Sequence, residues 1–178
     1  MDGKLDYHGH PLVDKMNIRM YNNAYHARGS AAVSKIKRLF MTRREARITV
    51  MQLLFEADFH KDESPEQIYG LARMAREFPD DDYVKDMFFG ISNHQTVLEN
   101  IIGRYSQNWS AKRISRVSYA AMCISIYEMV KREDIPVKVS INEAVQISKD
   151  FDEEKASPFV NGILNSVKDD LESIRHEF

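Results

Sequence analysis

The segment from Val117 to Val130 limits the folds that this chain can adopt, because apolar side chains cover it almost completely. Apart from tyrosine hydroxyls, its strongly polar residues are Ser118, Ser125 and Glu128. A helix that is apolar nearly all round is buried, with other elements packed against most of its surface. The sequence therefore predicts a central helix within 112–133, around which the rest of the chain packs.

The flanking segments show the 3.6-residue apolar period of amphipathic helices. One stripe consists of Val84, Met87, Phe88, Ile91, Leu98, Ile101, Ile102 and Tyr105, and another of Val160, Ile163, Leu164, Val167, Leu171 and Ile174. The predicted helices cover 43–60, 65–77, 82–106 (one long helix or a broken pair), 112–133, 140–150 and 158–175. The stretch Ile135–Val139 is short and contains a proline, so it predicts a connection and not a strand. The expected fold class is all-α.

Capping signals indicate where these helices begin, because a side-chain oxygen can accept from backbone N–H groups that lack a partner inside the helix. Two four-residue patterns predict capping boxes, Thr42 with Glu45 and Ser140 with Glu143. Two further starts combine a serine cap with a following proline, at Ser64-Pro65 (with Gln67) and at Ser157-Pro158.

Charge is distributed unevenly along the chain. Residues 1–40 carry seven Lys and Arg against three Asp, a net charge of +4, and show no sustained apolar period. The 18 basic and 24 acidic residues of 41–178 give that part a net charge of −6. We interpret 1–40 as a basic N-terminal arm or extension, either an anion-binding segment or a solvated tail, and 41–178 as the folded helical domain.

Several features predict a cytoplasmic protein without membrane contact. The single cysteine, Cys123, has apolar neighbours and excludes an internal disulfide, which favours a buried thiol in a reducing compartment. No apolar run reaches the roughly 18 residues that a membrane-spanning helix needs. The N-terminus also lacks the apolar stretch of a signal peptide.

The chain lacks the sharp signatures of catalysis, cofactor binding and metal binding. It contains no glycine-rich phosphate loop, HExxH, paired-cysteine spacing or GxSxG. The run Asp80–Asp82 is interpreted as favourable charge at a helix start, with a divalent cation as the alternative. Glu143 is assigned to its capping box in preference to an acid or base role. We expect a binding protein that is not an enzyme and needs no cofactor or metal.

Three arginines, Arg43, Arg44 and Arg47, stand at the start of the first predicted helix, where the 43/47 and 44/47 pairs share a face. Cations at this end oppose the helix dipole and are mildly unfavourable. A bound phosphate would reverse this, since it can accept from the free N–H groups and from the guanidinium forks. The arrangement favours a nucleic-acid site, with arginines extending into solvent as the alternative.

Several runs carry a specific pattern in uninterrupted order. They are RREARITVMQLLF from Arg43 to Phe55, DMFFGI from Asp86 to Ile91, Tyr127-Glu128, Asp134-Ile135-Pro136, INEAV from Ile141 to Val145, and FVNGIL from Phe159 to Leu164. Together they resemble the NusB family of bacterial transcription antitermination factors over residues 41–172. Cys123 departs from the pattern, standing where the family commonly has an arginine.

The resemblance implies an all-α fold of two small packed helical subdomains and a non-enzymatic role. In that role the protein binds the boxA element of single-stranded nascent RNA together with the ribosomal protein NusE. The complex then joins other Nus factors on RNA polymerase and supports antitermination, especially in ribosomal RNA operons.

The resemblance also implies a set of site residues. Motif position places RNA contacts on Arg44 and Arg47, with Arg43 adjacent, and brings the FVNG end near the RNA. The implied RNA-binding set is Arg43, Arg44, Arg47, Gln52, Lys155 and Phe159. Phe55, where the family usually has a tyrosine near the RNA and NusE surfaces, is the implied partner-binding residue, with core packing beside Ile48 and Met51 as the alternative.

The sequence is also compatible with two other functions. One is a protein-only interaction module of the same fold, whose arginines bind an acidic partner surface. The other is an enzyme, because a NusB-like domain occurs at the N-terminus of some ribosomal RNA cytosine methyltransferases. This chain ends at Phe178 with no catalytic motif after the helical region, so we expect no methyl transfer.

Overall fold

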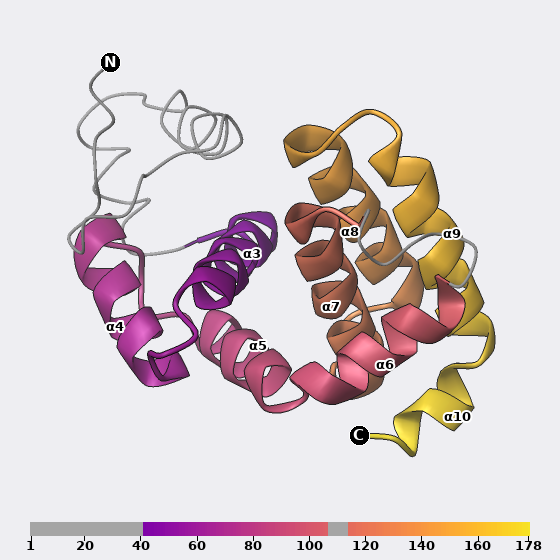
Figure 1. Cartoon of the computed structure of the whole chain (residues 1–178), viewed down its shortest axis with the longest axis horizontal. Coiled ribbons are helices and arrows are strands. Elements are labelled where there is room, and N and C mark those ends of the chain that lie inside the picture. Colours follow the sequence, from indigo (N-terminus) through magenta and orange to yellow (C-terminus); the bar gives the residue numbers. More distant parts are fainter. Residues whose placement is uncertain (1–40, 107–113) are drawn as a thin grey trace. The chain divides into compact units, whose positions relative to one another are not determined.

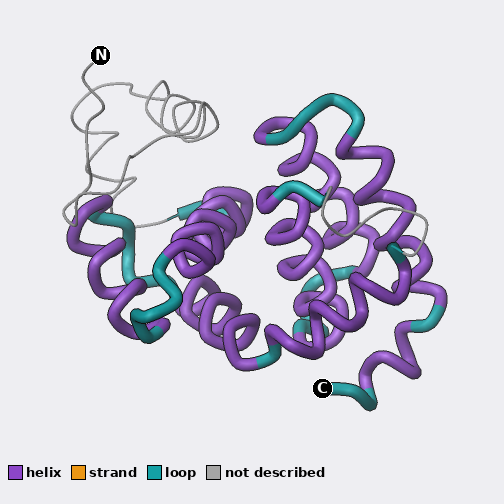
Figure 2. The backbone as a smooth tube through the Cα atoms, viewed as in Figure 1, coloured by secondary structure: helices purple, strands orange, loops and turns teal. Residues whose placement is uncertain are grey.

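Every regular element in the described part of the chain, residues 41–106 and 114–178 of this computed structural model, is a helix (Figures 1 and 2). The elements are α3 (Arg43–Phe59), α4 (Pro65–Arg76), α5 (Asp82–Asn93), α6 (Gln95–Tyr105), α7 (Arg116–Lys131), α8 (Val137–Phe151), α9 (Ala156–Asp169) and α10 (Leu171–Arg175). They belong to one compact unit, residues 37–178. The arm expected over 1–40 lies outside the described residues.

Helix α7 is the centre of this unit, as its apolar sequence predicts. Twelve of its sixteen residues are buried, from Val117 to Met129. It packs against α8 most extensively, and also against α3, α5 and α9 (Figure 1). The thiol of Cys123 is buried as expected, and burial raises its pKa to about 12.

The helices form two groups that meet at α7, which confirms the expected all-α fold of two packed subdomains. In the first group α3 packs against α4 and α5. In the second group α8 lies between α7 and α9, while α6 and α10 pack against α7 and α9. Contacts of α3 and α5 with α7 join the two groups. The segment expected as one long helix or a pair is a pair, broken at His94.

Two of the expected caps are present with both of their hydrogen bonds. Thr42 Oγ accepts from the Glu45 N–H at 3.2 Å, while the Thr42 N–H donates to the Glu45 carboxylate at 2.8 Å. Ser64 and Gln67 repeat this pattern at α4, with Pro65 as the first helical residue. Asp81 caps α5 by accepting from the Val84 N–H at 3.1 Å, so the acidic run has the helix-start role expected of it.

The other two caps were predicted wrongly. Helix α8 begins at Val137, so Ser140 lies inside the helix and Val137–Val139 are helical, not part of a connection. Helix α9 begins at Ala156, one residue before the expected Ser157 cap. Each helix therefore starts before its serine. The N-cap of α8 is Pro136, whose backbone is extended, and the N-cap of α9 is Lys155.

Two boundaries also differ from expectation. Helix α7 begins at Arg116 and not at 112, because Ser115 caps it by accepting from the Ser118 N–H at 3.0 Å. The segment expected as one helix over 158–175 is broken at Asp170 into α9 and α10.

Candidate nucleic-acid interface

The first turn of α3 presents two arginines at the surface. The Arg43 guanidinium lies 4.2 Å from the centroid of the Tyr83 ring, a cation–π contact. Arg44 donates to two carboxylates of α8, Glu143 at 3.2 Å and Asp150 at 2.7 Å. Its side chain is 39% exposed. The start of α3 is therefore anchored on α5 and α8 while its cationic side chains stay accessible.

Arg47 differs from the other two arginines, because it is only 3% exposed. Its guanidinium donates to the Glu128 carboxylate through Nε at 2.8 Å and through Nη2 at 3.4 Å. Burial alone would lower the pKa of Arg47, but the hydrogen bond and charge of Glu128 outweigh it and raise that pKa. The RNA contact implied for Arg47 stays a prediction, and in this structure its side chain makes core contacts.

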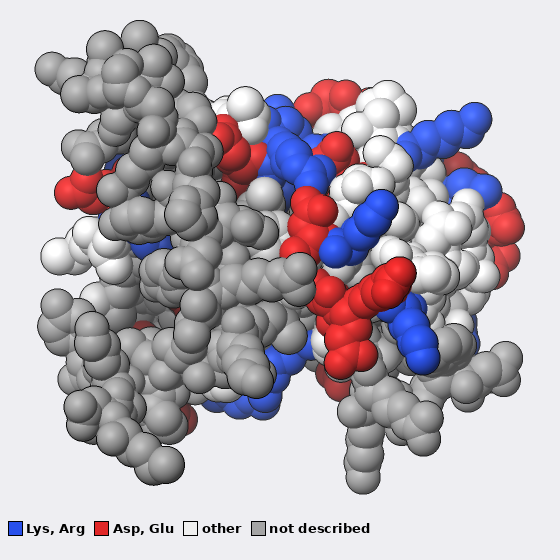
Figure 3. All heavy atoms as spheres, turned by 90° about the horizontal axis from the view of Figure 1, so that it is seen from above, with Lys and Arg blue, Asp and Glu red and all other residues white. Residues whose placement is uncertain are grey.

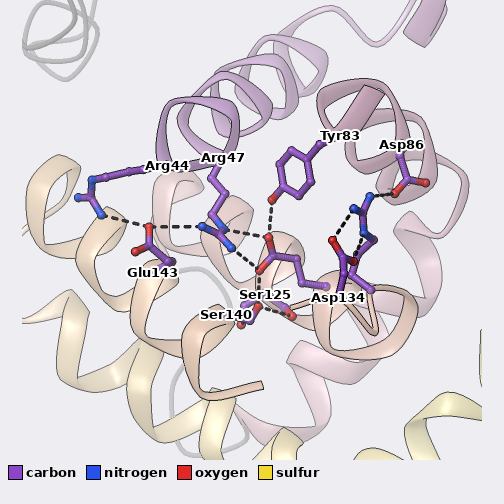
Figure 4. Close-up of polar contacts among 10 residues, drawn as sticks. Arg44, Arg47, Tyr83, Asp86, Ser125, Asp134, Ser140 and Glu143 are labelled. Atoms are coloured by element: carbon purple, nitrogen blue, oxygen red, sulfur yellow. Dashed lines mark hydrogen bonds and ion pairs between the residues drawn. The ribbon is translucent and has the colours of Figure 1, made fainter. Parts of the chain in front are cut away.

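Glu128 is fully buried and is the centre of a polar cluster that links the two helix groups. Figure 4 labels its partners Arg47, Tyr83 and Ser140. Its carboxylate accepts from Arg47 of α3, from the Tyr83 hydroxyl of α5, and from the Ser140 hydroxyl of α8 at 2.6 Å. Burial and the nearby carboxylate raise the pKa of Tyr83, so this hydroxyl stays protonated and donates. Each buried side-chain nitrogen or oxygen in 41–106 and 114–178 has a hydrogen-bond partner.

Glu143 has a role that its sequence position did not indicate. Its carboxylate lies between Arg44 and Arg47, 3.2 Å from Arg44 Nη1 and 3.6 Å from Arg47 Nη1 (Figure 4). The capping-box assignment is wrong because Ser140, three residues earlier, points into the core toward Glu128. Glu143 instead extends the polar cluster from the buried pair to the exposed Arg44.

The remaining predicted residues lie at three other places. Gln52 faces α4, where its side-chain oxygen accepts from Arg76 at 2.9 Å. Phe55 is half-buried, with its ring centroid 5.0 Å from that of Phe59. Lys155 is exposed beside the first turn of α9, and Phe159 is half-buried within that helix.

An exposed aromatic surface continues from Phe55 toward the end of α3. Phe59 is 59% exposed, and the Arg116 guanidinium lies 4.2 Å from its ring centroid. Arg116 also pairs with Asp58, which fixes the end of α3 against the start of α7. The structure thus brings Arg43 and Arg44 together at one end of α3 and Phe55 with Phe59 at the other.

Charged side chains of both signs are mixed on the described surface. In the view of Figure 3, Lys and Arg side chains are interspersed with Asp and Glu over the described part of that face. A second exposed ion-pair group holds Arg132 between Asp86 and Asp134, and Arg132 lowers the pKa of Asp134 to about 2. The candidate interface is therefore Arg43 and Arg44 at the start of α3, on a surface where basic side chains form ion pairs with acidic ones.

Sequence reasoning missed the buried cluster, although one signal for it was present. Glu128 is the single ionisable group among the apolar residues from Val117 to Val130, apart from tyrosine hydroxyls and Cys123. A carboxylate in such a helix needs a buried partner, because an unpaired buried charge is costly. Nothing in the local pattern identified that partner as Arg47, 81 positions earlier.

Neither metal binding nor membrane insertion has support in the described residues. Within 41–106 and 114–178, no three His, Cys, Asp or Glu side chains gather in a way that could hold a metal ion. Asp80, a candidate ligand, pairs instead with Lys85 at 2.7 Å and Arg73 at 3.1 Å. Over the same residues, no helix combines the length and apolar character needed to cross a bilayer.

The fold and site define a class: an all-helical protein whose two helix groups are joined through a buried carboxylate and which presents arginines at a helix start. Comparison with known families then identifies the chain. It belongs to the NusB family, whose model matches residues 44–169. The buried Arg47–Glu128 pair and the exposed Arg44 lie within the matched segment.

Individual relatives agree with this family assignment. The chain is 38% identical to the transcription antitermination protein NusB of Bacillus pumilus over 131 residues, which cover 74% of this chain and 98% of that protein. The structure of NusB from T. maritima is similar with a TM-score of 0.65 and 31% identity, over 74% of this chain and 93% of that one. A structure of antitermination factors NusB and NusE in complex with dsRNA shares the fold, with a TM-score of 0.61, 22% identity, and coverage of 76% and 97%.

Proposed function

We propose that this chain is a transcription antitermination factor that binds single-stranded boxA-type RNA together with the ribosomal protein NusE. The complex joins other Nus factors and RNA polymerase, notably on ribosomal RNA operons. Membership of the NusB family and the name of the Bacillus pumilus relative support this role. The observation that carries the RNA-binding part is the exposed arginine pair at the start of α3.

The RNA contact assigned to Arg43 and Arg44 has a direct physical basis. A guanidinium binds a phosphate through paired N–H groups, and the free backbone N–H groups of a helix start favour the same anion. Exposed Lys155 adds a sequence-independent phosphate contact, while Gln52, Phe159 and, by motif position, Arg47 complete the proposed RNA-binding set. Arg47 supports the site by holding α3 against Glu128.

Phe55 is assigned to the contact with NusE, together with the exposed Phe59. Aromatic side chains and Arg are enriched in protein interfaces. Burial of an exposed Phe ring by a partner removes apolar surface from water and so favours binding. The Arg116 guanidinium over Phe59 supplies that combination. Loss of NusE binding in Phe59→Ser, with RNA binding by the isolated chain retained, would support this assignment.

Gel-shift titration of the full chain with a boxA-like RNA, with and without NusE, tests the function. We expect NusE to tighten RNA binding. Arg44→Ala should weaken binding and reduce the slope of log affinity against log salt by about 0.7, the value for one phosphate of a single strand. Arg175→Ala is the matched control, because it removes an exposed, ion-paired arginine from α10.

Two results would contradict the proposal. Equal RNA affinity for the unmodified chain and Arg44→Ala would remove Arg44 from the site. Binding to NusE without any affinity for RNA would favour the protein-only interaction module, in which the arginines contact an acidic partner surface.

A further inference from the structure

The carboxylates around Arg44 have a consequence for RNA binding. Arg44 and Arg47 lie among three carboxylates, those of Glu128, Glu143 and Asp150. The cluster therefore carries one more negative than positive charge. A phosphate that approaches Arg44 meets a guanidinium whose two terminal nitrogens already donate to carboxylates.

The two carboxylates that contact Arg44 are not equivalent. Glu143 is 21% exposed and also lies 3.6 Å from the buried Arg47, so it belongs partly to the core cluster. Asp150 is 44% exposed and lies on the last turn of α8, 2.7 Å from Arg44 Nη2. Asp150 is thus the contact that Arg44 can exchange with least change to the surrounding structure.

We propose that Asp150 competes with RNA for Arg44 and thereby sets the affinity of the α3 site for a phosphate group. The inference rests on the proposed RNA-binding function. Carboxylate and phosphate oxygens accept the same charge-assisted hydrogen bonds from a guanidinium. When a phosphate binds, Arg44 exchanges the Asp150 carboxylate for a phosphate oxygen and keeps its contact with Glu143.

The test compares RNA affinities of the full chain and Asp150→Asn, using a single-stranded boxA-like RNA oligonucleotide as the probe. The asparagine keeps the shape of the side chain and removes its charge. At low salt we expect Asp150→Asn to bind the RNA about twofold to fivefold more tightly, the range that corresponds to one exposed ion pair. The gain should shrink as salt rises, because exposed charges are screened.

A matched control separates this competition from a general change in net charge. Asp169→Asn removes the same formal charge, one carboxylate, from α9, where Asp169 is 71% exposed and pairs with Lys168 at 3.2 Å. It should change RNA affinity less than Asp150→Asn does. Asp150→Glu, which keeps the competing charge, should bind RNA like the unmodified chain.

A double-variant cycle decides the mechanism. In an Arg44→Ala background, Asp150→Asn should give no more gain than Asp169→Asn. An equal gain from Asp150→Asn with and without Arg44 would overturn the competition. So would an unchanged affinity of Asp150→Asn when Arg44→Ala weakens binding, and that result would leave the proposed function standing. If Arg44→Ala has no effect on binding, both the competition and the assignment of Arg44 to the RNA site fail.

Discussion

Arg44 and Arg47 are three residues apart on α3, but their surroundings differ, and so do their roles. Arg47 is on the side of the helix that faces α7, where Glu128 neutralises it inside the core. Arg44 lies over α8 near solvent and contacts carboxylates that water can also reach. Removal of one partner from a buried pair leaves an uncompensated charge, whereas an exposed pair is weakened by solvent.

This difference predicts unequal losses of stability when each arginine is removed. Arg47→Ala should lower the free energy of unfolding by about 3–5 kcal/mol, because Glu128 loses its buried counter-charge. Arg44→Ala should lower it by less than about 1 kcal/mol. Urea denaturation followed by circular dichroism measures both values. Similar small losses for the two variants would show that the Arg47–Glu128 pair does not hold α3 in place.

Among the elements, α3 and α8 show why one four-residue pattern has two outcomes. Thr42 and Ser140 both precede a glutamate by three residues, but only Thr42 is a cap. Pro136 caps α8, so the helix starts at Val137, three residues before Ser140, and Ser140 lies in the helix interior, 1% exposed. The pattern is therefore informative only where the chain before it is not already helical.

Aspartate substitutions distinguish these two positions. Aspartate is as good a cap as threonine, so Thr42→Asp should change the free energy of unfolding by less than about 0.5 kcal/mol. Ser140→Asp places a second carboxylate beside the buried Glu128 and should cost about 3 kcal/mol or more. Thermal and urea unfolding of the two variants gives the comparison. Tolerance of Ser140→Asp would restore the capping role predicted from the sequence.

At the scale of the whole folded unit, the close approach of α5 and α7 helps join the two helix groups. Gly90 of α5 faces the ring of Tyr127 in α7, and a Cβ atom at this position would overlap the Tyr127 hydroxyl and ring carbons. Tyr127 is itself buried between the groups and tilted against His94 and Phe178. Two of the motifs that resemble the family, DMFFGI and Tyr127-Glu128, thus meet at this contact.

Alanine at two glycines tests the importance of this contact. Gly90→Ala should destabilise the protein by about 1–3 kcal/mol, because the added methyl group forces Tyr127 to move. Gly70→Ala in α4 is the matched control, since among the described residues no neighbouring atom lies within 4 Å of the added carbon. That substitution should stabilise the protein by about 0.5–1 kcal/mol through helix propensity. Equal effects on the urea midpoint would argue against close packing at Gly90.

Local sequence patterns were enough to predict the helical class, the central place of α7 and the starts of α3 and α4. These features depend on neighbours within a few residues: apolar period, caps and prolines. The family pattern also placed the candidate site at the start of α3. The sequence did not predict the contacts of each arginine. Local spacing shows which residues share a helix face but not what that face contacts.

Three contacts come from tertiary packing: Arg47 pairs with Glu128 in the core, Glu143 lies between two arginines, and Asp150 reaches Arg44. Each of these contacts joins residues 81 or more positions apart. Burial and partner together fix whether an arginine stabilises the fold or remains available to a ligand. Both depend on how α3 packs against α7 and α8, which no segment of the chain specifies alone.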